Sequence, residues 1–278
     1  MGLAVISYDP VEIHAAFSRQ HNITFPLLAD VGSETIKAYG ILNTVTEEAL
    51  GPNGDDPDVQ RDVQTYVSAV NPGERMLGIA FPGTFVLDPE GRVTSRFFED
   101  FYRERNTVSN LLVKLGVDAE PVEATRVSSA YLDITTHPSD ATVALGNRFT
   151  LILDLEPGSG MHVYAPGAEG YRVITLNLDP QPYLRPLAIT YPESEIYHFV
   201  PLDERVPVYR EPFTLLQEIV LEVQPEDQKL LEGQESVTVS GTLEYQACDD
   251  TVCYNPVSVP LSWTMSLRSL VRLRPQPQ

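Results

Sequence analysis

Cysteine is scarce in this sequence: its 278 residues contain 2 cysteines, Cys248 and Cys253. A zinc site needs about four ligands, and the histidines that could add to the cysteines, His137, His162 and His198, are scattered along the chain. No apolar run approaches the roughly 20 residues that span a bilayer. Basic residues are also few, with 19 Lys and Arg against 39 Asp and Glu and a net charge of -20. We therefore expect no metal, no membrane span and no nucleic-acid partner.

Apolar residues, in contrast, are plentiful. The 278 residues are 42% hydrophobic, which is enough to form cores for two globular domains. At the N-terminus, Met1-Gly2 leads directly into the strand-like run Leu3–Asp9, without the basic and apolar segments of a signal peptide. We expect either a naturally short first domain or an upstream segment that could have carried a signal. The N-terminus by itself leaves the compartment open.

The first half of the sequence predicts an α/β domain. Asp9 marks a helix start after the first strand, and Ser33 marks a second helix that ends at Gly40. Further expected elements are an extended stretch at 25–28, one amphipathic helix in an acidic insertion at 43–78 and a hairpin over 84–98. A last helix is expected to start near Asn106 or Thr107 and to end before Gly116. We assign residues 1–118 to this domain and the acidic stretch 119–126 to a linker.

Beyond the linker, the hydrophobic period changes to two. Apolar and polar residues alternate in the stretches 131–135, 149–155, 174–178, 215–223, 237–245 and 257–267. Short strands separated by proline- and glycine-rich turns are typical of an antiparallel sandwich. The predicted fold class is therefore two domains, with an all-β, immunoglobulin-like sandwich over 127–270 and a tail at 271–278.

Both cysteines lie in one motif, YQACDDTVCYNP, at the tip of a predicted β-hairpin. If Asp249–Val252 form the loop, Cys248 and Cys253 face each other where opposed Cβ atoms lie about 4.5–5.5 Å apart. A disulfide needs about 3.5–4.5 Å, so slight closure suffices. The spacing leaves two interpretations open, a redox pair or a structural staple. The adjacent charges of Asp249 and Asp250 favour a raised thiol pKa, which suits a relay that reacts with an activated partner.

The first half resembles the peroxiredoxin-like branch of the thioredoxin fold, the alkyl hydroperoxide reductase/thiol-specific antioxidant family. The resemblance rests on LAVISYD, ITFPLLAD, KAYGIL and FPGTFVLDPEGRV, which follow the expected order up to about residue 116. It implies a thioredoxin-like shape, incomplete at the N-terminus, with Pro82 as the cis-proline candidate. The family's catalytic cysteine lies on a helix before the strand at Leu3, and no cysteine precedes Cys248. The missing strand and helix would leave a sheet flank that a partner chain or a homodimer could cover.

The second half resembles the N-terminal periplasmic domain of the thiol:disulfide interchange protein family DsbD. The cysteine motif, VSVPLSW, GSGMHVYAPG and EIYHFVPLDERVPVY carry this resemblance over roughly residues 125–267. It implies that Cys248 and Cys253 shuttle electrons from a membrane-embedded partner to thioredoxin-fold proteins, beneath an aromatic cap. The cap candidates are Tyr197 and Phe199. Other residues expected near the pair are Tyr245, Asp249, Asp250, Tyr254, Tyr164 and His162.

Three functions remain open at this level. The favoured one is thiol:disulfide interchange through Cys248 and Cys253 in a bacterial periplasm or cell envelope, with thioredoxin-fold redox proteins or a membrane thiol reductant as partners. The second is a peroxiredoxin-type antioxidant protein whose catalytic cysteine lies upstream, with a structural disulfide in the sandwich. This chain alone should then show no peroxidase activity. The third is a non-enzymatic binding or assembly module. None of the three calls for a cofactor.

Overall fold

The chain forms two compact units in the computed structural model, which describes residues 2–67, 77–98, 104–117, 122–199, 203–223 and 229–269. Unit 1 extends to Glu104, and unit 2 runs from Arg105 to Leu270. The expected tail at 271–278 and the first part of the expected linker lie outside the described residues. Within the described ranges, every helix is too short or too polar to cross a membrane.

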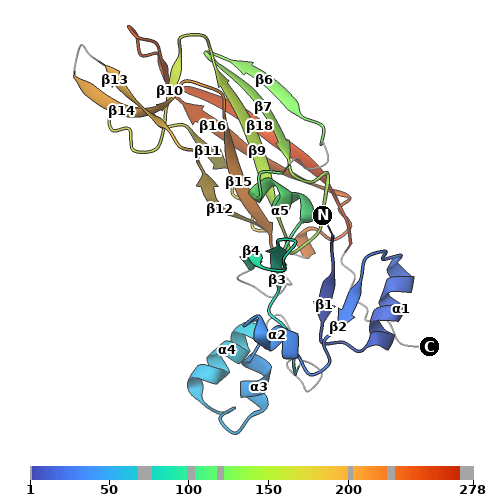
Figure 1. Cartoon of the computed structure of the whole chain (residues 1–278). Coiled ribbons are helices and arrows are strands. Elements are labelled where there is room, and N and C mark those ends of the chain that lie inside the picture. The colour runs from blue at the N-terminus through green and yellow to red at the C-terminus, as the bar shows by residue number, and fades with distance from the viewer. Residues whose placement is uncertain are drawn as a thin grey trace. The chain divides into compact units, whose positions relative to one another are not determined.

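Unit 1 combines short strands with helices (Figure 1). Its elements are β1 (Val5–Ser7), α1 (Val11–His21), β2 (Leu27–Ala29), α2 (Glu34–Ala38), α3 (Val45–Leu50), α4 (Pro57–Val67), β3 (Gly83–Leu87) and β4 (Val93–Phe98). Strands β1 and β2 pair in parallel, and α1 makes the crossover that parallel strands require. Strands β3 and β4 form the predicted hairpin, whereas the insertion holds two helices, α3 and α4, where the sequence predicts one.

The helix starts of unit 1 differ in detail from the prediction. Pro10 is the N-cap residue of α1 in place of Asp9. Ser33 precedes α2 as predicted, but its hydroxyl donates a hydrogen bond to the Gly78 carbonyl oxygen at 2.6 Å. The Asp30 carboxylate instead accepts from two backbone N–H groups in the first turn of α2. Asp30, which lies outside the local capping pattern, therefore satisfies two of the backbone N–H groups that have no partner within this helix.

The segment before β3 contradicts the predicted cis-proline. The peptide bond before Pro82 is trans, so that expectation was wrong. The preceding residues run in extended form beside another loop: Phe81 N–H donates to the Ile41 carbonyl at 2.7 Å, and Asn43 N–H donates to the Ile79 carbonyl at 2.9 Å. An X–Pro peptide bond prefers the trans form by about 0.5–1 kcal/mol. The two hydrogen bonds between the segments at Ile41 and Phe81 form with the Phe81–Pro82 bond in this preferred form.

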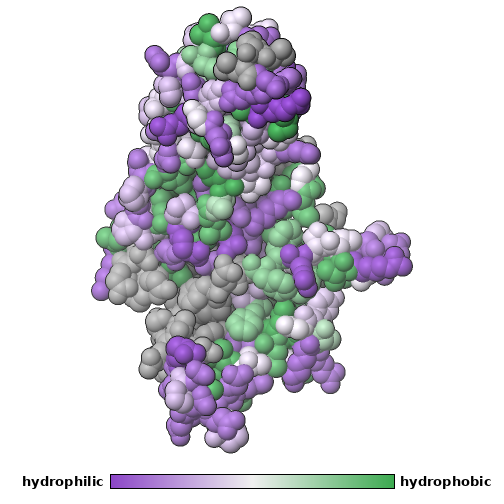
Figure 2. Space-filling view, turned by 90° about the vertical axis from the view of Figure 1, so that its left-hand side faces the viewer, coloured by the Kyte–Doolittle hydropathy of each residue, from purple (hydrophilic) through white to green (hydrophobic). Residues whose placement is uncertain are grey.

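Hydrophobic side chains on the first strands of unit 1 remain exposed. Val5 and Ile6 of β1 are each 43% exposed, and Leu28 of β2 is 47% exposed. In the part of unit 1 that the structure describes, the β1–β2 and β3–β4 pairs are not hydrogen-bonded to each other. Hydrophobic residues also lie among hydrophilic ones on the face drawn in Figure 2. The strands of unit 1 thus form two small pairs instead of one continuous sheet.

Unit 2 consists mainly of three sheets. Its elements are β5 (Arg105–Asn106), α5 (Val108–Lys114), β6 (Thr125–Ser129), β7 (Leu132–Pro138), β8 (Thr142–Val143), β9 (Asn147–Pro157), β10 (His162–Tyr164), β11 (Thr175–Leu178), β12 (Leu184–Thr190), β13 (Glu195–Phe199), β14 (Glu204–Tyr209), β15 (Phe213–Leu221), β16 (Ser236–Tyr245), β17 (Ala247–Cys248) and β18 (Val257–Leu267). The largest sheet has the order β12-β15-β9-β7-β6, with β5 also paired to β9. The other two have the orders β11-β16-β18-β8 and β13-β14-β10-β17.

The six-stranded sheet and the β11-β16-β18-β8 sheet share one hydrophobic core. Buried and exposed residues alternate along β16 and β18, as the period of two predicts. Leu151 and Leu153 of β9 belong to the same buried cluster as Val239 of β16 and Trp263 of β18. This core positions the long β16 and β18 strands, whose connection carries the cysteines.

Helix α5 packs within unit 2, although the sequence predicts it as the last element of residues 1–118. Its N-cap is Thr107, as expected, whose side chain accepts from the Asn110 N–H at 3.1 Å. The buried Asn110 side chain accepts from Thr150 of β9 at 2.5 Å and donates to Glu218 of β15 at 3.2 Å. Capping residues mark where a helix begins, but they carry no information about the sheet on which it packs.

Candidate functional site

The two cysteines form a disulfide at the mouth of a tight hairpin. Cys248 and Cys253 pair as an antiparallel bridge, with their Cα atoms 4.1 Å apart. Asp249 N–H donates to the Val252 carbonyl at 3.0 Å, and Tyr254 N–H donates to the Ala247 carbonyl at 3.0 Å. The predicted loop Asp249–Val252 is confirmed by this geometry.

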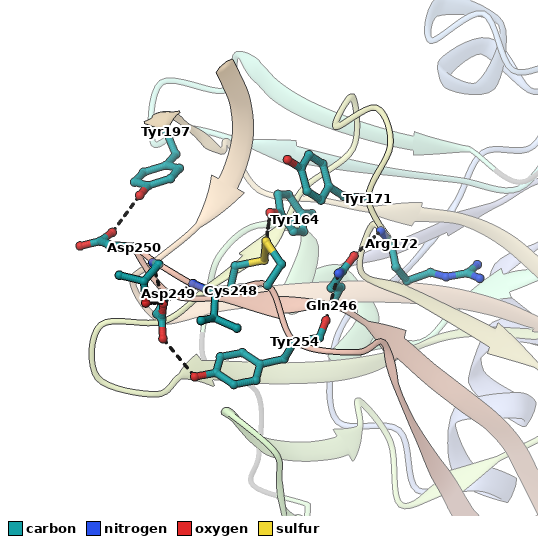
Figure 3. Close-up of a disulfide and its surroundings, with 12 residues drawn as sticks. Tyr164, Tyr171, Arg172, Tyr197, Gln246, Cys248, Asp249, Asp250 and Tyr254 are labelled. Atoms are coloured by element: carbon teal, nitrogen blue, oxygen red, sulfur yellow. Dashed lines mark hydrogen bonds between the residues drawn. A yellow bond between two sulfur atoms is a disulfide. The ribbon is translucent and has the colours of Figure 1, made fainter. Parts of the chain in front are cut away.

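Asp249 holds the loop in shape. Its Oδ1 accepts from the Thr251 hydroxyl and from the N–H groups of Thr251 and Val252, each at 2.7 Å. Its Oδ2 accepts from the Tyr254 hydroxyl at 3.0 Å. These hydrogen bonds, those of Thr251 first, lower the pKa of Asp249 to about 2. The carboxylate is therefore ionised at neutral pH and is engaged in the loop (Figure 3).

The two sulfur-bearing residues differ in exposure. Cys248 is only 1% exposed, whereas Cys253 is an exposed residue. Cys248 lies on β17 opposite His162 of β10, and Tyr164 lies at the end of the same strand. Cys248 packs in a small buried group separate from the main core, which we call the cysteine cluster: Tyr164, Val206, Val208 and Cys248. Of the two residues of the disulfide, Cys253 is thus the exposed one.

The hydroxyl of Tyr164 contacts both sulfurs. It lies 3.0 Å from Cys248 Sγ and 3.3 Å from Cys253 Sγ, and since a disulfide has no S–H, the hydroxyl is the donor (Figure 3). The Tyr164 ring stacks on Tyr171, with centroids 4.0 Å apart, and the Tyr171 hydroxyl donates to Glu204 at 2.6 Å. Burial, followed by Tyr171 and Glu204, raises the pKa of Tyr164. This hydroxyl therefore keeps its proton throughout the physiological pH range.

A second aromatic group borders the loop on the β13 side. The Tyr197 hydroxyl donates to Asp250 at 2.8 Å, and the Tyr197 ring lies 4.6 Å from the ring of His162. The Arg210 guanidinium lies 5.5 Å from the same tyrosine ring. Burial and Arg210 lower the pKa of His162, against the opposing effect of the nearby aspartates. Of the two cap candidates, Tyr197 bonds to the cysteine loop, while Phe199 pairs with Glu204 across β14.

The remaining residues expected near the pair divide into two groups. Tyr254 stacks on Tyr131 with centroids 4.1 Å apart and bonds to Asp249, so it belongs to the loop. Tyr245 is fully buried in the main core, and its hydroxyl donates to the Ala130 carbonyl at 2.5 Å, so it has a structural position. The sequence analysis did not single out Tyr171, Glu204 or Arg210, although Glu204 lies in the stretch EIYHFVPLDERVPVY.

An open groove of about 690 Å³ lies beside this site. Its lining includes Tyr171, Arg172, Tyr191, Gln246 and Pro256. The Arg172 N–H donates to Gln246 Oε1 at 3.1 Å, and the Gln246 amide donates to the Tyr254 carbonyl at 3.0 Å (Figure 3). The groove is thus connected to the cysteine loop by a short series of hydrogen bonds.

Two segments of the chain match known families. Residues 2–96 match the AhpC/TSA family, and residues 135–259 match the family described as thiol:disulfide interchange protein DsbD, N-terminal. No curated protein matches the chain. Both resemblances seen in the sequence are thereby confirmed.

Two solved structures are similar to parts of the chain. The reduced N-terminal domain of DsbD from Neisseria meningitidis is 18% identical, over 42% of this chain and 80% of that one, with a TM-score of 0.28. The N-terminal periplasmic domain of ScsB from Proteus mirabilis is 12% identical, over 49% of each chain, with a TM-score of 0.36. The chain thus spans about half the length of the ScsB domain. It joins a segment similar to the AhpC/TSA family to one similar to the DsbD N-terminal family, and the latter contains both cysteines.

Proposed function

We propose that the protein exchanges electrons with partner thiols through the Cys248–Cys253 disulfide. The match of residues 135–259 to the DsbD N-terminal family supports thiol–disulfide redox chemistry. The observation that carries the proposal is the asymmetry of the pair, in which Cys253 is exposed and Cys248 is 1% exposed beneath a tyrosine hydroxyl. A bond needed only as a staple has no requirement for one exposed and one buried cysteine.

The asymmetry assigns an order to the exchange. A partner thiolate attacks Cys253 Sγ, the bond between the cysteines breaks, and Cys248 leaves with the electron pair as a thiolate. A second thiolate of the partner then attacks the partner sulfur of the mixed disulfide and releases Cys253. The pair gains two electrons, the partner becomes a disulfide, and each released thiolate takes a proton from solvent according to pH. In the opposite direction, the same steps run in reverse.

Five side chains take supporting roles in this proposal. Tyr164 donates a hydrogen bond to the departing Cys248 thiolate, and Tyr197 acts as the cap through its bond to Asp250. Asp249 and Tyr254 keep the loop closed. His162 packs beneath Tyr197, and its lowered pKa keeps the imidazole neutral, so it adds no charge beside the sulfurs.

The partners follow from the chemistry of the pair. We propose thioredoxin-fold redox proteins or a membrane thiol reductant as partners, in a periplasm or cell envelope, where disulfides persist. The immunoglobulin-like class of the second domain is part of the same proposal. Unit 1 contributes no thiol, because no cysteine precedes Cys248, so we propose no peroxidase activity for this chain. The described residues give no support for the expected homodimer.

The reduction potential of the pair tests this function. The oxidised protein is equilibrated with dithiothreitol and with glutathione buffers, and the free thiols are counted by alkylation. A reversible transition above about -300 mV, the level below which structural bridges usually lie, is expected. A transition far below that value, together with no exchange with a thioredoxin, would mean that the disulfide is a structural staple.

Single-cysteine variants test the order of attack. In C248S the exposed Cys253 thiol remains, and it should form a mixed disulfide with oxidised glutathione. In C253S the buried Cys248 thiol remains and should react much more slowly. Equal reaction of the two variants would contradict the assignment of Cys253 as the attacked sulfur.

A further inference from the structure

The Tyr164 hydroxyl is held by residues that lie outside the cysteine hairpin. Tyr164 ends β10, Tyr171 belongs to the loop that follows, and Glu204 begins β14. The rings of Tyr164 and Tyr171 are nearly parallel, at 13°, with centroids 4.0 Å apart. The Tyr171 hydroxyl donates to Glu204 Oε2 at 2.6 Å. Three separate elements therefore meet to fix one hydroxyl beside the disulfide.

The loop that carries Tyr171 needs such an anchor. Gly167 and Gly170 both have positive φ angles, of 97° and 81°, and glycine adopts this conformation because it is the least restricted residue. The contacts of the Tyr171 side chain add to the backbone hydrogen bond of the next residue, Arg172 N–H to Gln246 Oε1, in holding this loop. The hydrogen bond to Glu204, at 2.6 Å, fixes the hydroxyl end of the Tyr171 ring. Tyr171 in turn supplies the flat surface on which the Tyr164 ring lies (Figure 3).

On the basis of the proposed function, we propose that Tyr171 and Glu204 are positioning residues that hold the Tyr164 hydroxyl against both sulfurs during exchange. The step they affect is the departure of Cys248. When a thiolate bonds to Cys253, the electron pair of the broken S–S bond stays on Cys248, which is 1% exposed. Burial penalises this charge, and the Tyr164 hydroxyl at 3.0 Å offsets the penalty by donating a hydrogen bond.

The Glu204 carboxylate is engaged by the Tyr171 hydroxyl. A carboxylate beside a departing thiolate would oppose it through like-charge repulsion. Glu204 Oε2 instead accepts from the Tyr171 hydroxyl, and the Tyr171 ring stacks on Tyr164, whose hydroxyl contacts the sulfurs. The proposal therefore gives Glu204 a geometric role, in which a neutral acceptor of the same shape should serve equally well.

The rate at which dithiothreitol reduces the disulfide tests the proposal. Dithiothreitol requires no docking surface, so a role of Tyr171 in the adjacent groove does not enter the measurement. In Y164F the rate should fall about tenfold, which corresponds to the loss of one hydrogen bond to a charged group. In Y171F the ring remains while its anchor is lost, and we expect a fall of roughly threefold. The control Y191F removes a tyrosine hydroxyl that lies on the groove and bonds to the Ile174 carbonyl. It should reduce at the wild-type rate.

Two comparisons distinguish positioning from other roles. In the Y164F background, Y171F should cause no further loss, because it acts through the Tyr164 hydroxyl. E204Q should retain the wild-type rate, whereas E204A should behave like Y171F. A further loss in the double variant, or equal effects of E204Q and E204A, would overturn the proposal, as would a wild-type rate for Y164F. If the cysteine pair of the wild-type protein failed to exchange, the proposed function would be wrong. This outcome is measured on the wild-type protein, so it is distinct from a failure of the positioning proposal, which is measured on the variants.

Discussion

The main core of unit 2 and the cysteine cluster both bury polar groups, but their partners differ. In the main core, Trp263 Nε1 donates to Thr136 Oγ1 at 2.9 Å, and Thr136 donates to the Ile152 carbonyl at 2.7 Å. These partners are the same in every redox state. In the cysteine cluster, Tyr164 donates to sulfurs whose charge changes when the disulfide opens. Burial in the main core thus stabilises the fold, whereas in the proposed function burial in the cluster acts on the opening of the disulfide.

Truncation in the main core should have the largest effect on stability. Leu153 of β9 is fully buried, and L153A should lower the free energy of unfolding by about 3 kcal/mol through lost burial and a residual cavity. Urea unfolding of the oxidised protein measures this loss. The folded fraction should still reduce with dithiothreitol at the wild-type rate. A changed rate in folded L153A would remove the distinction between the two regions.

Opening the disulfide should cost less than the core truncation. The bond closes a short loop, with a sequence separation of 5, and loop entropy of that size is worth about 2 kcal/mol. Urea unfolding with and without reductant gives the difference, with C248S/C253S as the matched variant. A loss near 5 kcal/mol would mean that the bond mainly staples the domain.

The buried amide of Asn110 should contribute somewhat less again. N110A removes the acceptor of the Thr150 hydroxyl and the hydrogen bond to Glu218, which keeps its ion pair with Lys114, and we expect a loss of about 1.5 kcal/mol. The measurement is urea unfolding of a fragment that begins at Arg105, compared with the same fragment without the substitution. An unchanged stability would contradict the packing of α5 as part of unit 2.

Sequence patterns predicted the parts of this structure that depend on neighbouring residues. Alternation on both sides of the cysteines predicted the loop Asp249–Val252, and Thr107 predicted the start of α5. The contacts of Tyr171 with Tyr164 and Glu204 join residues from separate strands and a loop, so no local period reveals them. The expectation for Pro82 came from resemblance alone, and the trans bond there shows that a similar sequence does not fix a local backbone geometry.

Removal of the Tyr197 hydroxyl should change exchange without a large change in stability. Y197F loses the bond to Asp250 and should loosen the cap over the loop, so that dithiothreitol reduces the disulfide about twofold to threefold faster. F199L, at the other cap candidate, serves as the control and should react at the wild-type rate. If F199L accelerated reduction while Y197F did not, the cap would be assigned to Phe199.

The smallest expected effect comes from acid titration of Asp249. The pKa of this carboxyl is lowered from 3.8 to about 2 by its bonds to Thr251 and Val252, so the ionised form stabilises the folded loop. That contribution is fully present above pH 3.8 and is lost as the pH falls through about 2. Urea unfolding between these pH values should therefore show a small decrease in stability, and D249N should make the decrease smaller because it no longer titrates there. The main core has no part in this change, since its hydrogen bonds from Trp263 and Thr136 do not titrate. An equal acid dependence in the wild type and D249N would place the sensitivity outside the cysteine loop.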